Sequence, residues 1–90
     1  MTNPGYLAID GHRMLHSLQE AQTKLNTGSG DLVLDFSAVH RIDPASLRAL
    51  EELARVAEEK SAPVTLRGIN VEIYKVLKLA RLSSRFSFVN

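Results

Sequence analysis

The sequence predicts an α/β domain built on a small, mostly parallel sheet, and three observations support this fold class. Short apolar runs typical of strands alternate with amphipathic segments typical of helices, in the order β-α-β-α-β-α-β. Asp43 and Pro44 form a strong helix-start signal shortly after one of these strands. Right-handed crossovers through helices make consecutive strands parallel. We therefore expect about four strands, with three helices mainly on one face of the sheet.

The clearest strand-helix unit lies between residues 31 and 60. The run Leu32–Phe36 is apolar except for Asp35, which is typical of a central strand covered on both faces. The Asp43 carboxylate can accept hydrogen bonds from the free amides of the first helical turn, and Pro44 gives up an amide that has no partner there. The helix that follows has one broad apolar face, which we expect to pack on the sheet: Leu47, Leu50, Leu53, Ala54, Val56 and Ala57.

The other elements follow from the same signals. A strand is expected at Tyr6–Ile9, before an Asp-Gly turn, and an amphipathic helix at His12–Leu25. A third strand is expected at Val64–Arg67, closed by a glycine. Asn70 can cap a third helix that continues through Leu82, and Phe86–Val89 forms a last short strand.

Composition limits the functional classes. The 90 residues are 44% hydrophobic and fit one domain, residues 1–90. The 11 basic and 10 acidic side chains are interspersed along the sequence, so we expect no nucleic-acid partner. We expect no membrane insertion, because no apolar run approaches the ~20 residues that a spanning helix needs and the N-terminus lacks signal-peptide features. The absence of cysteine excludes disulfides and is compatible with a cytoplasmic location.

Signals for metal or phosphate binding are weak. His12 and His16 are four residues apart and could sit side by side on a helix as metal ligands. The only other histidine is His40, and no HExxH pattern is present, so we expect no metal. The loop Gly28–Gly30 precedes a strand rather than a helix and lacks the lysine of a phosphate cradle. A connecting loop is the better interpretation.

No catalytic group stands out either. Asp10, Asp35 and Asp43 follow or occupy strand segments and could gather at one end of the sheet. They have no evident general-base partner, and turn or capping roles are the better interpretation. We predict that the protein is not an enzyme and uses no cofactor.

The stretch VLDFSAVHRIDPASLRAL, residues 33–50, resembles the strand-loop-helix core of STAS domains (sulphate transporter and anti-sigma factor antagonist). The matching residues are Asp35 to Ser37, Ile42 with Asp43, and Leu47. Residues 64–70 and 76–82 are similar to the fourth strand and last helix of the family, and especially to the small STAS subunit of the Mla phospholipid ABC transporter. The similarity covers about Leu7 to Phe88 and implies a single STAS-like domain.

Several positions depart from the family pattern. In anti-sigma factor antagonists the residue after the loop aspartate is the Ser or Thr that a partner kinase phosphorylates, and here it is Pro44. Ala45 and Ser46 occupy the next two positions, which are commonly Ser/Gly and Gly, and Ser46 is a fallback phosphosite. Met14 takes the place of a family aspartate. The N-terminus is short, so the N-terminal edge strand of the family could be missing.

The resemblance implies a non-catalytic module for protein-protein interaction in the bacterial cytoplasm, acting as an anti-sigma factor antagonist-like regulator without the usual phosphorylatable Ser/Thr. Its partner would be an anti-sigma factor or serine kinase. The alternatives are a STAS subunit that binds the ATPase of a lipid-transport ABC system, or a sensor of a small ligand or nucleotide. The expected partner surface, unless Pro44 and Ser46 only start the helix, consists of His40, Arg41, Asp43, Pro44, Ser46 and Arg48.

Overall fold

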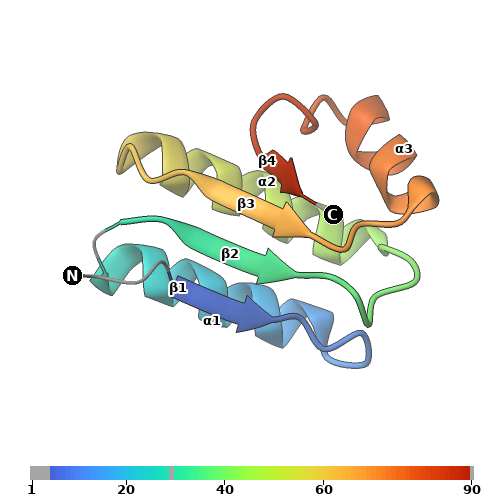
Figure 1. The fold of residues 1–90 in the computed structure, drawn as a ribbon, viewed down its shortest axis with the longest axis horizontal. Coiled ribbons are helices and arrows are strands. Elements are labelled where there is room, and N and C mark those ends of the chain that lie inside the picture. The colour runs from blue at the N-terminus through green and yellow to red at the C-terminus, as the bar shows by residue number, and fades with distance from the viewer. Residues whose placement is uncertain (1–4, 29, 90) are drawn as a thin grey trace.

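The computed structural model describes residues 5–28 and 30–89 of the chain. The elements, in chain order, are β1 (Gly5–Ala8), α1 (Met14–Thr27), β2 (Leu32–Asp35), α2 (Pro44–Glu59), β3 (Val64–Arg67), α3 (Val71–Leu79) and β4 (Ser87–Val89). Figure 1 shows this alternation of strands and helices along the chain. The predicted α/β fold class is confirmed.

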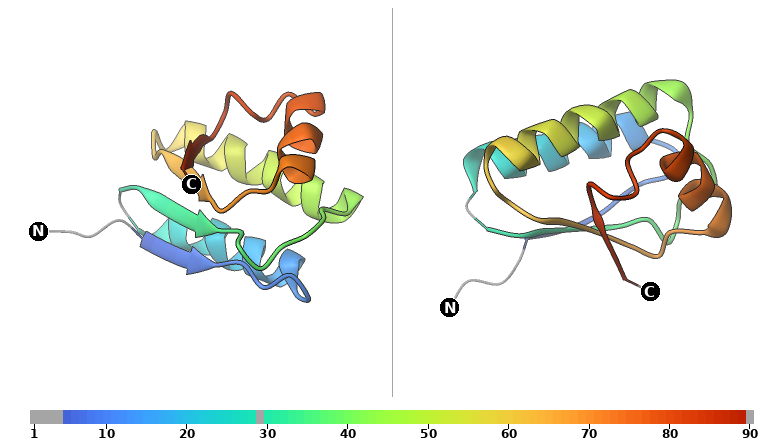
Figure 2. Two further views of the ribbon diagram at one scale, coloured as in Figure 1. Left: turned by 45° about the vertical axis from the view of Figure 1, so that its right-hand side comes forward. Right: turned by 90° about the horizontal axis from the view of Figure 1, so that it is seen from above.

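The sheet has the strand order β1-β2-β3-β4, and each neighbouring pair is parallel. In the register, Leu34 of β2 lies between Leu7 of β1 and Leu66 of β3. Successive right-handed crossovers that advance in one direction place their helices on the same face of the sheet. Figure 2 shows this result, with α1 and α2 side by side over one face and α3 beside β4.

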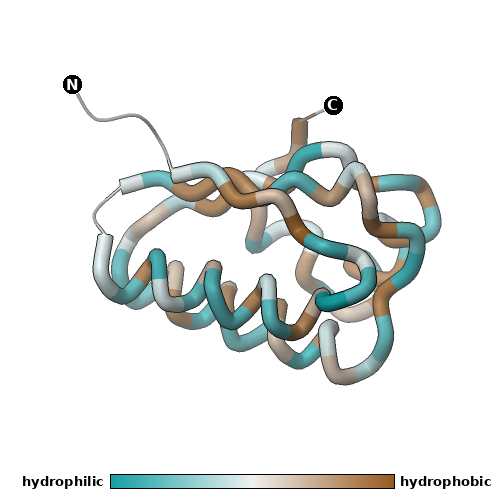
Figure 3. The backbone as a smooth tube through the Cα atoms, turned by 90° about the horizontal axis from the view of Figure 1, so that it is seen from below, coloured by the Kyte–Doolittle hydropathy of each residue, from teal (hydrophilic) through white to brown (hydrophobic). Residues whose placement is uncertain are grey.

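The hydrophobic core lies between this face of the sheet and the helices α1 and α2. Along both helices apolar residues alternate with polar ones, and the strands are largely apolar (Figure 3). The predicted packing of α2 is confirmed, because Leu50 and Ala54 are completely buried, whereas Leu47 is only partly buried. The main core residues of the sheet, α1 and α2 are Leu32, Leu34, Val64, Leu66, Leu18, Ala21, Leu25, Leu50, Leu53 and Ala54.

Within residues 5–28 and 30–89, no helix covers the second face of the sheet, so the prediction that β2 is covered on both faces was wrong. Val33 and Asp35 of β2 point to this open face and are half-buried. Tyr6, one strand away, is 53% exposed, and its hydroxyl donates to Asp35 Oδ2 at 2.5 Å. The apolar run led to the wrong prediction because only its alternate positions, Leu32 and Leu34, face the core, and one buried face is enough to explain them.

Three helix ends differ from the predicted ones. The first helix was expected to end at Leu25 but continues to Thr27. The first helix was expected to begin at His12 but begins at Met14, because the Arg13 amide donates to Asp10 O at 3.0 Å and closes a turn. The third helix was expected to continue through Leu82 but ends at Leu79. Arg81 adopts φ 62°, and the Leu82 amide donates to Leu77 O at 2.8 Å, which is the pattern of a Schellman motif. Leu82 is thereby buried in the core.

Candidate docking site

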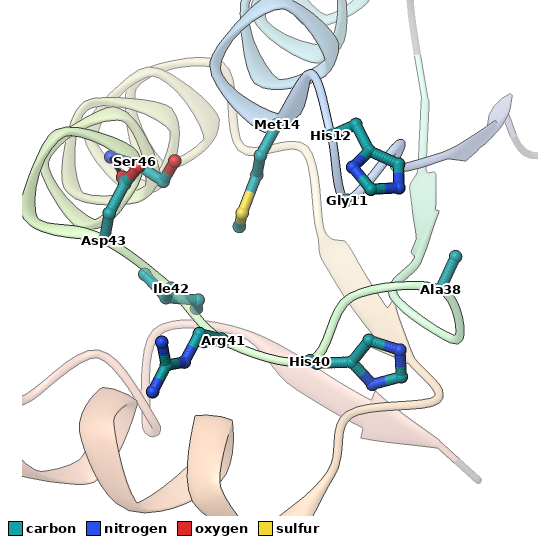
Figure 4. Close-up of a pocket in the computed structure, with 9 residues that line it drawn as sticks. All are labelled: Gly11, His12, Met14, Ala38, His40, Arg41, Ile42, Asp43 and Ser46. Atoms are coloured by element: carbon teal, nitrogen blue, oxygen red, sulfur yellow. Dashed lines mark hydrogen bonds between the residues drawn. The ribbon is translucent and has the colours of Figure 1, made fainter.

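A cleft of about 630 Å³ opens where β1 and β2 end and α2 begins. One wall is the turn between β1 and α1, and the other is the loop between β2 and α2 (Figure 4). Its lining residues are Gly11, His12, Met14, Ala38, His40, Arg41, Ile42, Asp43 and Ser46. The cleft thus lies beside the loop and helix start on which the partner surface was predicted.

The start of α2 is fixed by its own residues. Asp43 has extended backbone geometry, with φ −87° and ψ 168°, and its Oδ1 accepts a hydrogen bond from the Ser46 amide at 2.7 Å. Pro44 occupies the first turn, where it loses no intrahelical bond. Hydrogen bonding from Ser46, from its amide first and its side chain second, lowers the pKa of Asp43 below its ordinary value. Asp43 is therefore a charged N-cap at neutral pH.

Two close contacts position the β2-α2 loop against its neighbours. A Cβ atom on Gly11 would lie 2.6 Å from Ala38 O, so the two cleft walls approach each other closely only because residue 11 has no side chain. On the other side, Asn70 Nδ2 donates to His40 O at 3.2 Å while its Oδ1 caps α3 by accepting from the Ile73 amide at 2.8 Å. The loop is therefore held by β1-α1 and by the start of α3.

The structure brings most of the predicted partner-binding residues to one exposed surface. His40, Arg41 and Asp43 line the cleft and are exposed. Pro44 and Arg48 are exposed on the first turns of α2 and do not line the cleft. These five residues, His40, Arg41, Asp43, Pro44 and Arg48, are named here the α2 docking surface.

Ser46 does not belong to this exposed surface, so its placement there was wrong. Only 1% of the residue is exposed. Ser46 lies four residues before the buried Leu50 and therefore on the core-facing side of α2, a spacing that could have indicated its burial from the sequence. A kinase would have to open the first turn of α2 to reach the hydroxyl, which argues against Ser46 as a phosphosite.

The β1-α1 wall was missed in the sequence. His12 is exposed and Met14 is 8% exposed, and in Figure 4 the Met14 side chain points from α1 into the space beside Ser46 and Ile42. The predicted strand order could have indicated this wall. The carboxyl ends of adjacent parallel strands meet at one edge of the sheet, so the segment after β1 lies beside the segment after β2.

The groups considered for catalysis have structural roles. Asp10 Oδ1 accepts from the His12 amide at 2.9 Å, and Asp43 caps α2. Asp35 lies on the open face of the sheet and accepts hydrogen bonds from Ser37 and Tyr6, which lower its pKa to about 2.

The histidines offer no metal centre. His12 lies in the turn before α1, so it is not one helical turn from His16 as predicted, and His16 Nε2 lies 3.0 Å from Glu20 Oε1. Within residues 5–28 and 30–89, no three His, Cys, Asp or Glu side chains gather in a way that could hold a metal ion. In the same part of the chain, no helix is both long and apolar enough to span a membrane.

The chemistry of the α2 docking surface favours recognition over catalysis. It offers the cations Arg41 and Arg48, the imidazole of His40, and a helix N-terminus whose partial positive charge attracts acidic groups. Its only carboxylate, Asp43, is already engaged in the cap. A partner with acidic side chains would fit this surface.

Comparison with known proteins agrees with the fold and the sequence pattern. Residues 5–89 match the family model described as "Mlab, STAS domain". The chain belongs to the STAS domain family. Its fold is similar to the crystal structure of a candidate anti-sigma factor antagonist from Thermotoga maritima, with a TM-score of 0.69 at 21% identity, covering 100% of this chain and 76% of that one. No curated protein matches the sequence.

Proposed function

We propose that this STAS domain is a non-catalytic module that docks a protein partner through the α2 docking surface. The proposal rests mainly on one observation, the start of α2. There a capped helix N-terminus is surrounded by exposed His40, Arg41, Pro44 and Arg48, with no nucleophile-base pair beside it. Such a surface can bind an acidic partner without catalysing a reaction.

The first turn of α2 also bears on control of docking. Pro44 and Ala45 have no hydroxyl group, and the hydroxyl of Ser46 is buried. The phospho-switch that the family resemblance implies thus has no acceptor on the exposed part of this turn. Docking is constitutive or governed by the partner, and the protein acts in the bacterial cytoplasm as an anti-sigma factor antagonist-like regulator.

A second candidate is a STAS subunit that binds the ATPase of a lipid-transport ABC system. The description of the matching family model, which names Mlab, favours it. The same surface serves both candidates, so the identity of the partner decides between them.

Binding measurements with purified proteins test the proposal. The chain is titrated with the anti-sigma factors or serine kinases and with the ABC-transporter ATPases encoded in the same genome. Arg41→Glu and Arg48→Glu should each weaken binding to the true partner about tenfold, mainly by slowing association, because both reverse an exposed charge next to the helix N-terminus. Lys60→Glu, which reverses an exposed charge just past the far end of α2, is the matched control.

Each outcome has a clear reading. Binding to an anti-sigma factor that falls only in the first two variants supports the first candidate, and the same result with an ATPase supports the second. A partner that binds all three variants as tightly as the parent chain would place the interaction outside the α2 docking surface.

A further inference from the structure

The helix α3 and the strand β4 lie on the side of the sheet away from β1 (Figure 1), and a second surface lies between them. It is a groove of about 300 Å³, named here the α3-β4 groove. Its lining residues are Ile69, Asn70, Val71, Tyr74, Phe88 and Val89. None of these belongs to the α2 docking surface.

The α3-β4 groove is apolar and accessible. Val71 is 69% exposed, Val89 is 50% exposed and Tyr74 is 42% exposed. Tyr74 packs edge-to-face against Phe88 with ring centroids 5.3 Å apart, which holds α3 against the sheet and shapes the groove. Exposed apolar side chains that adjoin in a concave surface are typical of interaction sites, whereas scattered ones are not.

Each exposed apolar residue of the groove has a cation as a neighbour. Lys75 follows Val71 by four residues on the exposed side of α3, and Lys78 follows Tyr74 by the same spacing. Arg67 of β3 is the register partner of Val89. Among the described residues, no salt bridge engages Lys75, Lys78 or Arg67.

Charge in the last third of the sequence is strongly unbalanced, although Arg85 there is paired with Glu58 of α2. Residues 61–90 contain five basic side chains and a single acidic one, Glu72. The near neutrality of the whole chain hides this difference, since the four glutamates of α2 supply much of the opposite charge. The α3-β4 groove is thus apolar inside and basic at its rim.

We propose that the α3-β4 groove binds an acidic peptide segment of another protein, with one or two large apolar side chains between Asp or Glu residues. The apolar side chains would enter the groove beside Val71, Tyr74 and Val89, and the carboxylates would pair with Lys75, Lys78 and Arg67. An anionic membrane would also attract the cations. The concave shape of the apolar part favours a peptide, whose side chains can enter the groove, over a flat lipid surface.

This inference goes beyond the proposed function and does not require it. The two surfaces are neighbours, joined by the hydrogen bond from Asn70 to His40 O, yet they share no residue. A variant of one surface can therefore leave the other intact.

Selection from a phage-displayed library of random peptides on the immobilised full chain tests the groove. Enriched peptides should combine acidic residues with Leu, Ile, Phe or Trp. Labelled with fluorescein and titrated by anisotropy, they should bind the double variant Lys75→Glu/Lys78→Glu at least about tenfold more weakly than the parent, and Val71→Asp similarly. These positions are exposed, so the variants should fold as the parent does.

Two controls separate the groove from other effects. Lys24→Glu/Lys60→Glu carries the same change of charge away from the groove, and Arg48→Glu alters only the α2 docking surface. Both should bind the peptides as the parent does. Enrichment of basic or uncharged peptides, equal binding by Val71→Asp, or a lysine-dependent attachment to phosphatidylglycerol vesicles without peptide binding would each overturn the proposal.

Discussion

The two helices that border the cleft begin in different ways. α2 starts with a side-chain cap, since Asp43 accepts from the Ser46 amide at 2.7 Å, followed by Pro44. α1 starts after Arg13, which has φ −137° and ψ 48° and provides no side-chain cap. Its first turn is held instead by the buried Ser17, whose Oγ accepts from the Asp10 amide at 3.1 Å.

The difference shows two ways of positioning one site. The start of α2 is determined by adjacent residues, so Asp43, Pro44 and Arg48 keep their local geometry whatever lies opposite, whereas the loop residue His40 is also held by the hydrogen bond from Asn70. The start of α1 depends on a hydrogen bond between residues seven apart and on packing against the sheet. One wall of the cleft is therefore encoded locally, and the other is assembled by the tertiary structure.

The largest effect should come from breaking the packing that both walls share. Leu50→Asp would place an unpaired charge at a completely buried position of α2, and we expect the fold to be lost at room temperature. Leu15→Asp on α1, at a residue that is 44% exposed, is the matched control and should melt close to the parent. Thermal unfolding followed by circular dichroism measures both, and a Leu50→Asp melting point within a degree or two of the parent would refute the packing of α2.

Removing the cap of α2 should cost less. Asp43→Ala leaves the Ser46 amide without its side-chain partner and should lower the melting temperature by about 4–8 °C, the usual effect of a lost N-cap in a domain of this size. Arg13→Ala, at the corresponding position of α1, should change it by only about a degree, because Arg13 makes no capping bond. Equal shifts in the two variants would contradict the distinction between the helix starts.

The start of α1 should respond to a residue inside the helix. Ser17→Ala leaves the part-buried Asp10 amide unpaired and should lower the free energy of unfolding by roughly 1 kcal/mol. The higher helix propensity of alanine offsets a small part of this loss. Hydrogen exchange of the Asp10 amide should accelerate more than that of Ser46. Thr23→Ala, at an exposed position of the same helix, is the control, and a similar acceleration there would exclude the assigned role of Ser17.

Acid should weaken the two starts unequally, and this is the smallest expected effect. The pKa of Asp43 is lowered by its hydrogen bonds from Ser46, so the cap stabilises the protein above about pH 4 and loses this contribution as the pH falls through the folded-state pKa. Asp35 on the open face of the sheet has a pKa of about 2, so its stabilising contribution is also lost as the pH falls through this value. Nuclear magnetic resonance between pH 5 and pH 2 should show the resonance of the Ser46 amide shifting as Asp43 is protonated. The resonance of the Ser17 amide should stay nearly unchanged. Matching shifts of both amides would contradict the unequal response of the two helix starts.

Much of the fold was predictable because its signals are local. The period of the apolar residues indicated all the helices and strands, and Asp43 with Pro44 and Asn70 marked two helix starts correctly. The start of α1 was missed because Ser17 and Asp10 act across a turn, with no cap signal in the adjacent sequence. The end of α3 was missed because Arg81 takes a left-handed conformation without glycine, and the burial of Leu82 accompanies it.

The sequence by itself determined the family pattern, the capped start of α2 and the part of the α2 docking surface that lies on this helix start, since these depend on residues within one or two turns of each other. The tertiary structure alone decided which residues face the α2 docking surface across the cleft. It also decided that no helix covers one face of the sheet within the described residues, and that Val71 and Val89 line the same α3-β4 groove. The physical reason is that strand order and crossover direction bring together segments far apart in the chain, and no local propensity records those contacts.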